Sequence, residues 1–196
     1  RRLGTQVALV LPGSGGASGA LPSRAEGMYA DFAGQGRPLL PVYKLHGSVL
    51  WTVDSGKPVI HETPSQAQRA IEEDHQLPLI APPTWAKKPT NAFMRAIWHS
   101  AFQALSRAKV IAVIGYSYPT TDVFFEHLLT AALAANDDLR RIVVINPDPE
   151  VDGRFRRFLD SVFQLRRYSF LPVSLGEAVS NAHGFLRTIG VEPPPS

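Results

Sequence analysis

Two polar segments of the sequence each follow directly after an apolar run, and their residue types suit the binding of a nucleotide. Residues 115–122 (GYSYPTTD) come after KVIAVI, and Asn146-Pro-Asp148 comes after RIVVI. A turn of small residues that leads into a helix presents free backbone N–H groups at the positive end of the helix dipole, where a phosphate is favoured. An amide and a carboxylate after the next strand are groups with which doubly wound folds hold a ribose.

The same residues also fit a purely structural role. Gly115 and Pro119 would then only make the turn, and Thr121 and Asp122 would cap the following helix. Asn146 would simply end its strand. Neither segment is a GxGxxG fingerprint, so the residues alone leave both interpretations open.

His46 is the candidate for acid–base chemistry. It follows a β-prone run and precedes Gly47-Ser48, so it is expected to end a strand at a glycine turn. A neutral imidazole near pH 7 suits a general base, although a lone His is more often structural. No other His pairs with a His or carboxylate at metal-ligand spacing, and the chain has no Cys. We therefore expect no metal site, disulfide or Cys nucleophile.

Apolar periodicity in the second half predicts the elements that must position these residues. Helices are expected at 93–105, as part of a helix of about eighteen residues, and at 122–135, 151–163 and 175–189. The first is expected to be capped by Thr90 or Asn91, the second by Thr120 or Thr121, and the last by a Ser174–Glu177 capping box. Strands are expected at 109–115, 141–146 and 165–170. Strand, helix, strand is a βαβ unit. The predicted fold class is α/β, with a Rossmann-like parallel sheet and flanking helices.

The first half is expected to hold shorter elements. Strands are predicted at 7–11, 42–46, 49–53, 59–60 and 77–80, a turn at 54–58, and a polar helix at 65–75. Residues 1–38 are interpreted as a linker with a Gly-rich loop, 39–190 as the folded domain, and 191–196 as a disordered tail.

Composition narrows the class of protein. The 196 residues are 44% hydrophobic, enough for one sizeable core, and carry a net charge of only +3. Such a balance does not indicate a nucleic-acid surface, and the cluster Arg154, Arg156, Arg157, Arg166 and Arg167 is interpreted as a solvated helix face. No apolar run approaches the length of a membrane helix. We expect a cytoplasmic domain, part of a longer polypeptide, whose partner is a small molecule.

Several short motifs agree in order and spacing with the bacterial SIR2-like domain. These are Tyr43-Lys-Leu-His46-Gly-Ser48 with Trp51, Pro78-Leu-Ile-Ala-Pro-Pro83 with Lys87, Ile97-Trp98 with Ala101 and Leu105, Ile114-Gly-Tyr-Ser-Tyr-Pro-Thr-Thr-Asp122, and Val144-Ile-Asn-Pro-Asp148. Residues 39–160 resemble about the carboxyl-terminal two-thirds of such a domain.

The resemblance implies a fold that binds NAD as a substrate and breaks its bond between nicotinamide and ribose. His46 matches the sirtuin His that acts as base on the ribose hydroxyls. Six further residues match or adjoin positions that contact NAD: Gly47, Gly115, Ser117, Asp122, Asn146 and Asp148.

Departures from the family refine this expectation. Sirtuin deacylases carry a four-Cys zinc module, which a chain without Cys lacks. The chain is therefore more similar to the zinc-free SIR2-like enzymes of anti-phage defence, which hydrolyse NAD and would act as a homo-oligomer or with a fused or associated effector domain. The family's upstream Asn-Asp motif has no counterpart here. Residues 13–22 superficially resemble its Gly-rich first turn, but they lie too close to His46 for the helices and strand that should intervene. The chain is thus expected to hold about half of the active site.

Three alternatives remain open from the sequence. The domain could bind NAD or a related nucleotide as a sensor, or act as a scaffold, without cleaving a nucleotide. It could instead be an NAD-dependent protein deacylase. The third alternative is an α/β-hydrolase, in which Ser117 would be the nucleophile and Asp148 and His183 would complete a catalytic triad. Against the hydrolase, Pro119 occupies the last position of the elbow, and the following helix is expected to start too late.

Overall fold

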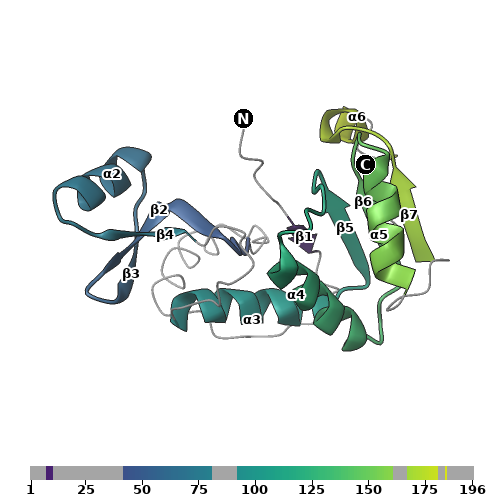
Figure 1. The fold of residues 1–196 in the computed structure, drawn as a ribbon, viewed down its shortest axis with the longest axis horizontal. Helices are drawn as coiled ribbons and strands as arrows, with labels where there is room; N and C mark the ends of the chain where they lie inside the picture. The colour runs from purple at the N-terminus through teal and green to yellow at the C-terminus, as the bar shows by residue number, and fades with distance from the viewer. Residues whose placement is uncertain (1–7, 11–41, 81–91, 161–166, 181–183, 185–196) are drawn as a thin grey trace, which may run out of the picture.

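The computed structural model describes residues 8–10, 42–80, 92–160, 167–180 and 184, which form two sheets and their helices. The larger sheet has the strand order β1-β5-β6-β7, and the smaller has the order β3-β2-β4. Figure 1 shows the small sheet at one end of the molecule and the large sheet at the other, with helices α3 and α4 between them. The expected α/β class is confirmed at this coarse level.

The large sheet contains three parallel strands and one antiparallel strand. Its strands are β1 (Ala8–Val10), β5 (Val110–Ile114), β6 (Arg141–Ile145) and β7 (Tyr168–Leu171). Strands β5, β6 and β7 run parallel, whereas β1 pairs with β5 in the antiparallel sense. The crossovers are α4 (Val123–Ala134) and α5 (Glu150–Asp160), so the predicted βαβ unit is confirmed.

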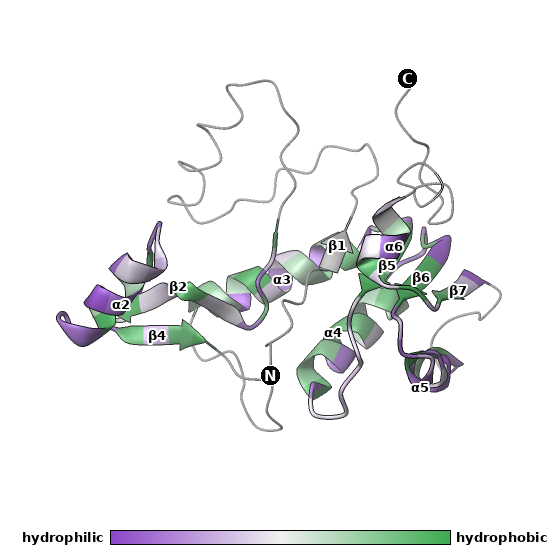
Figure 2. Ribbon diagram, turned by 90° about the horizontal axis from the view of Figure 1, so that it is seen from above, coloured by the Kyte–Doolittle hydropathy of each residue, from purple (hydrophilic) through white to green (hydrophobic). Residues whose placement is uncertain are grey.

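The core lies on the face of the large sheet that these helices cover. Helix α3 (Ala92–Ser106) joins α4 and α5 there, and one cluster contains buried side chains of all three helices and of β5 and β6. The opposite face has a smaller cluster, in which Val143 and Ile145 pack near α6 (Leu175–Ser180). Figure 2 shows β5 and β6 as apolar and α5 as mostly hydrophilic. Burial of alternate residues on both faces explains the near-continuous apolar sequence of these strands.

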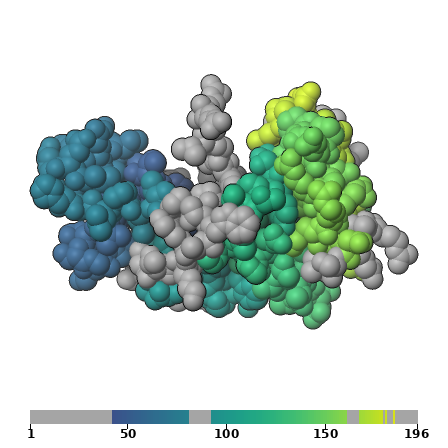
Figure 3. Space-filling view, viewed as in Figure 1, coloured from purple at the N-terminus to yellow at the C-terminus, as the bar shows by residue number. Residues whose placement is uncertain are grey.

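The small sheet is a hairpin with a third strand and a helix beside it. Strands β2 (Gly47–Asp54) and β3 (Lys57–Ile60) form the hairpin, and β4 (Leu77–Ile80) pairs with β2. Helix α2 (Pro64–Glu72) begins with a capping box, formed by its N-cap Thr63 and by Gln66. The space-filling view shows these residues gathered at one end of the molecule (Figure 3).

A buried hydroxyl ties the small sheet together. Thr52 is fully buried, and its hydroxyl donates to Gln76 Oε1 at 2.5 Å. That hydroxyl has one proton, so the 2.8 Å contact with His61 Nε2 is satisfied when the His nitrogen donates. These bonds offset the cost of burying the polar group.

Two expectations about local structure were wrong. Residues 42–46 do not form a strand, because the Gly47 N–H bonds to the Lys44 carbonyl at 3.0 Å and turns the chain before β2 begins. The N-cap of α4 is Asp122 rather than Thr120 or Thr121, because the Asp122 carboxylate accepts the Phe125 N–H.

Other expectations are confirmed or fall outside the described residues. The Ser174–Glu177 capping box is present at α6. Helix α3 has 15 residues instead of about eighteen. Several predicted features fall outside the described residues. They are the caps expected at Thr90 and Asn91, most of the linker 1–38 with its Gly-rich loop, the ends of the helices expected at 151–163 and 175–189, and the tail 191–196.

Candidate functional site

His46 lies in the turn that precedes β2, beside helix α3. Trp98 on α3 donates its indole N–H to the Leu45 carbonyl at 2.8 Å, which fixes the backbone next to His46. The Trp98 and His46 rings meet edge to face, with 6.3 Å between centroids. The His46 side chain is 25% exposed, but its Nε2 is buried. The ring is therefore held with one nitrogen inside the protein.

Asp122 is the group that faces this nitrogen. Its Oδ2 lies 3.5 Å from His46 Nε2, and its side chain is 1% exposed. The same oxygen accepts the Tyr116 hydroxyl proton at 3.0 Å, while Oδ1 accepts the Phe125 N–H at 3.4 Å. Burial raises the pKa of Asp122, but the neighbouring His46 ring and the hydrogen bond from Tyr116 outweigh it and leave the pKa below its usual value. The carboxylate is thus ionised at neutral pH.

Residues 115–122 form the loop that carries Asp122 to His46. Gly115 directly follows β5 and has a φ of +67°, a conformation that favours glycine, and its N–H bonds to the Ile145 carbonyl at 2.9 Å. Tyr118 has a φ of +52°, and its ring packs on Phe155 with centroids 4.8 Å apart. Packing against the core therefore holds the loop in this conformation.

Asn146 fastens this loop to the end of β6. Its side-chain amide is buried and donates to the Tyr116 carbonyl at 3.2 Å, and its Oδ1 accepts the Asp148 N–H at 2.9 Å. The structure thus gives Asn146 a role in holding the loop, and the predicted contact with a ribose stays a prediction.

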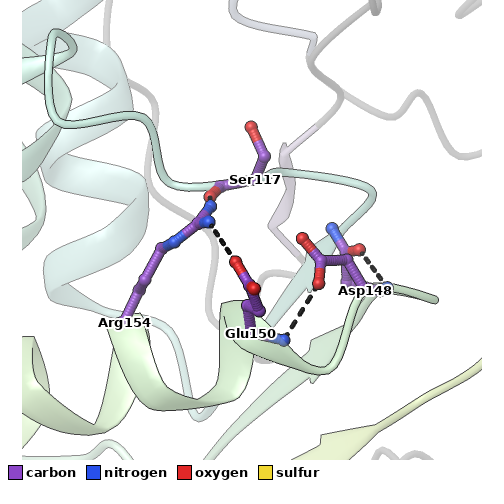
Figure 4. Close-up of polar contacts among 5 residues, drawn as sticks. Ser117, Asp148, Glu150 and Arg154 are labelled. Carbon is purple, nitrogen blue, oxygen red and sulfur yellow. Dashed lines mark hydrogen bonds and ion pairs between the residues drawn. The ribbon is translucent and has the colours of Figure 1, made fainter.

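Ser117, Asp148 and α5 meet on the exposed side of the same loop, as Figure 4 shows. Arg154 donates to the Ser117 carbonyl at 3.0 Å and to Glu150 Oε2 at 3.0 Å. Asp148 accepts the Glu150 N–H at 2.9 Å near the start of α5. Ser117 and Asp148 are both exposed at the carboxyl end of the parallel strands, where ligands of such sheets bind.

Gly47 is explained by the small sheet. Its φ is +81°, and a Cβ at this position would clash with the Leu79 carbonyl oxygen of β4. This close approach accounts for a glycine directly after His46, and the predicted contact of Gly47 with NAD stays a prediction.

The structure joins part of the predicted site into one network. The network runs from His46 to Asp122, then to Tyr116, and through the Tyr116 carbonyl to Asn146. Ser117 and Asp148 lie around Arg154 rather than in this network.

Three residues have roles that the sequence analysis did not assign. Trp98 and Tyr116 stand inside the quoted motifs, but nothing in their spacing indicated that they contact His46 and Asp122. Arg154 was interpreted as part of a solvated face, whereas it bridges α5 to the loop. Its spacing of four residues from Glu150 was the available signal.

The hydrolase alternative gains no support from this geometry. Helix α4 begins at Val123, well after Ser117, whereas the helix of a nucleophile elbow starts at the nucleophile. His183, its third member, lies outside the described residues.

Among the described residues, no group of three His, Asp or Glu side chains could hold a metal ion. None of the helices in this part of the chain is long and apolar enough to cross a membrane. Comparisons with protein-family models, with curated proteins and with solved structures gave no significant match.

Proposed function

We propose that this chain is an NAD-binding domain of the zinc-free SIR2-like class, and that it takes part in cleaving the bond between nicotinamide and ribose. One observation carries the proposal. The network from His46 through Asp122 and Tyr116 to Asn146 joins three of the five segments on which the sequence resemblance rests. Those segments are far apart in the chain, and their meeting at the carboxyl end of a parallel sheet is what a nucleotide site of this fold requires.

His46 is the base in the proposed reaction. As the bond to nicotinamide breaks, nicotinamide leaves with the bonding electron pair, and positive charge develops on the ribose ring. His46 accepts a proton from a ribose hydroxyl, and water adds to the anomeric carbon. One proton of that water restores the ribose hydroxyl, and His46 then releases its proton to solvent, so that ADP-ribose and one H⁺ are formed. A buried, ionised carboxylate beside His46 stabilises the imidazolium that forms.

The loop 115–122 and the residues after β6 bind the remainder of NAD in this proposal. A Cβ at Gly115 would meet no atom of the described residues within 4 Å, which leaves room for a ligand beside the backbone there. The exposed carboxylate of Asp148 is able to accept hydrogen bonds from the hydroxyls of a ribose. The proposal extends to a cytoplasmic defence enzyme that acts as a homo-oligomer or with an effector domain.

Nicotinamide release from NAD by the full-length protein, followed by chromatography, tests the proposal, because residues 39–190 are expected to hold only about half of the active site. We expect release by the wild type to fall by about 10²- to 10⁴-fold in His46→Ala. The matched control is His99→Ala, because His99 is exposed on α3 and its ring hydrogen-bonds to Gln103 on the same helix. Release that survives in His46→Ala would remove His46 from the reaction.

A calorimetric titration with NAD separates cleavage from sensing. NAD that binds to the wild type without release of nicotinamide would favour the sensor or scaffold alternative. Absence of both binding and release would overturn the proposed class altogether.

A further inference from the structure

The contact with Asp122 favours one tautomer of the His46 imidazole, because one particular ring nitrogen faces the carboxylate. Nε2 of His46 is buried and faces Asp122 Oδ2 at 3.5 Å, although a quarter of the side chain is exposed. An ionised carboxylate only accepts hydrogen bonds, so the neutral ring is favoured with its proton on Nε2. In that tautomer the lone pair is on Nδ1.

Asp122 is itself fixed in place from several sides. The Tyr116 hydroxyl donates to Oδ2, the Phe125 N–H donates to Oδ1, and the residue caps α4. Burial raises the pKa of Tyr116, so its hydroxyl stays protonated and able to donate. A carboxylate with these partners does not need to reorient when the charge on His46 changes.

Trp98 restrains the ring from another side. Its indole packs edge to face on His46, and its N–H is bonded to the Leu45 carbonyl. Among the residues that the structure describes, the titratable groups that interact with Asp122 or Tyr116 include Tyr118 and Glu126.

We infer that Asp122 is a positioning residue that holds the His46 imidazole as its Nε2–H tautomer, so that Nδ1 is the nitrogen that accepts the proton from substrate. This inference rests on the proposed function of His46 as a base. It assigns Asp122 to His46 rather than to NAD, the contact expected from the sequence resemblance. The proton moves from the ribose hydroxyl to Nδ1, and the resulting imidazolium is paired with the Asp122 carboxylate.

Nitrogen NMR of the imidazole tests the tautomer without any turnover. In ¹⁵N-labelled wild type above the His46 pKa, we expect the Nε2–H form to dominate. Dominance of the Nδ1–H form would overturn the inference, and this part of the test needs no substitution.

Asp122→Asn separates the role of the charge from the role of the cap. Asn caps helices about as well as Asp, so α4 is expected to keep its start. Loss of the carboxylate should lower the His46 pKa by about one unit or more, and nicotinamide release should fall by about 10²- to 10⁴-fold in kcat with little change in KM. The matched control, Asp137→Asn, changes an exposed carboxylate in the loop after α4 and should leave both unchanged.

Failure of the inference and failure of the proposed function give different results. A His46 pKa and tautomer that are identical in wild type and Asp122→Asn would overturn the inference, whatever the enzyme releases. Tyr116→Phe keeps the carboxylate, so the Nε2–H form should persist in it. Wild-type protein that shows the Nε2–H form but releases no nicotinamide would overturn the proposed function and support the positioning of the ring.

Discussion

Gly47→Ala tests whether the turn beside His46 is set by the close approach of two strands. Gly47 has a φ of +81°, which costs an L residue about 1–2 kcal/mol. The added Cβ would also clash with the Leu79 carbonyl oxygen of β4, and overpacking of this kind costs about 1–3 kcal/mol. We therefore expect the free energy of unfolding to fall by about 2–5 kcal/mol.

Gly56→Ala is the matched control for this prediction. Gly56 has nearly the same φ, +80°, in the turn between β2 and β3, but a Cβ there would meet no atom within 4 Å in the part of the chain that the structure describes. Its substitution should cost only the backbone term, about 1–2 kcal/mol. Urea unfolding followed by far-UV circular dichroism measures both variants. A Gly47→Ala cost no larger than that of Gly56→Ala would refute the close approach of β2 and β4.

The remaining predictions concern the supports of the network and of the core. Asn136→Ala removes two hydrogen bonds to backbone carbonyls at the end of α3, so urea unfolding should show a loss of about 1–3 kcal/mol without a change in nicotinamide release. Trp98→Phe removes the donor to the Leu45 carbonyl, and release should fall by about ten- to a hundredfold as the His46 turn shifts. The pKa of Asp122 is lowered in the folded protein, so its contribution to stability is present above the unfolded value, about 3.9, and is lost as the pH falls through the folded pKa. In Asp122→Asn the free energy of unfolding should therefore depend less steeply on pH in the acid range. The pKa of Tyr116 is raised, so its contribution is present below about pH 10 and is lost above it. In Tyr116→Phe the free energy of unfolding should depend less steeply on pH in the alkaline range.

The elements with a strong apolar period were the ones that the sequence could predict. Strands β5 and β6 are buried on both faces, and their near-continuous apolar runs indicate this without knowledge of the fold. Helix α4 was predicted within one residue at each end, because its apolar positions face one core. The hairpin turn at Ser55-Gly56 followed from local turn chemistry.

Features that depend on tertiary contacts could not be predicted from the pattern of apolar residues in the sequence. Residues 42–46 are β-prone, but a turn bond from Gly47 and the Trp98 bond to Leu45 determine their path. Asp122 and His46 are far apart in the sequence, and no helix or strand periodicity relates their positions. Their contact depends on how the loop after β5 lies against the turn before β2, which no local propensity encodes.

The rate of nicotinamide release at saturating NAD, compared between wild type and His46→Ala, tests the central claim most directly. Saturation removes differences in NAD binding, so the comparison reports the steps that follow binding. The account predicts that the wild type forms nicotinamide and ADP-ribose in equal amounts, and that the variant binds NAD but releases nicotinamide about 10²- to 10⁴-fold more slowly. Equal rates in the two proteins would contradict the assignment of His46 as the base.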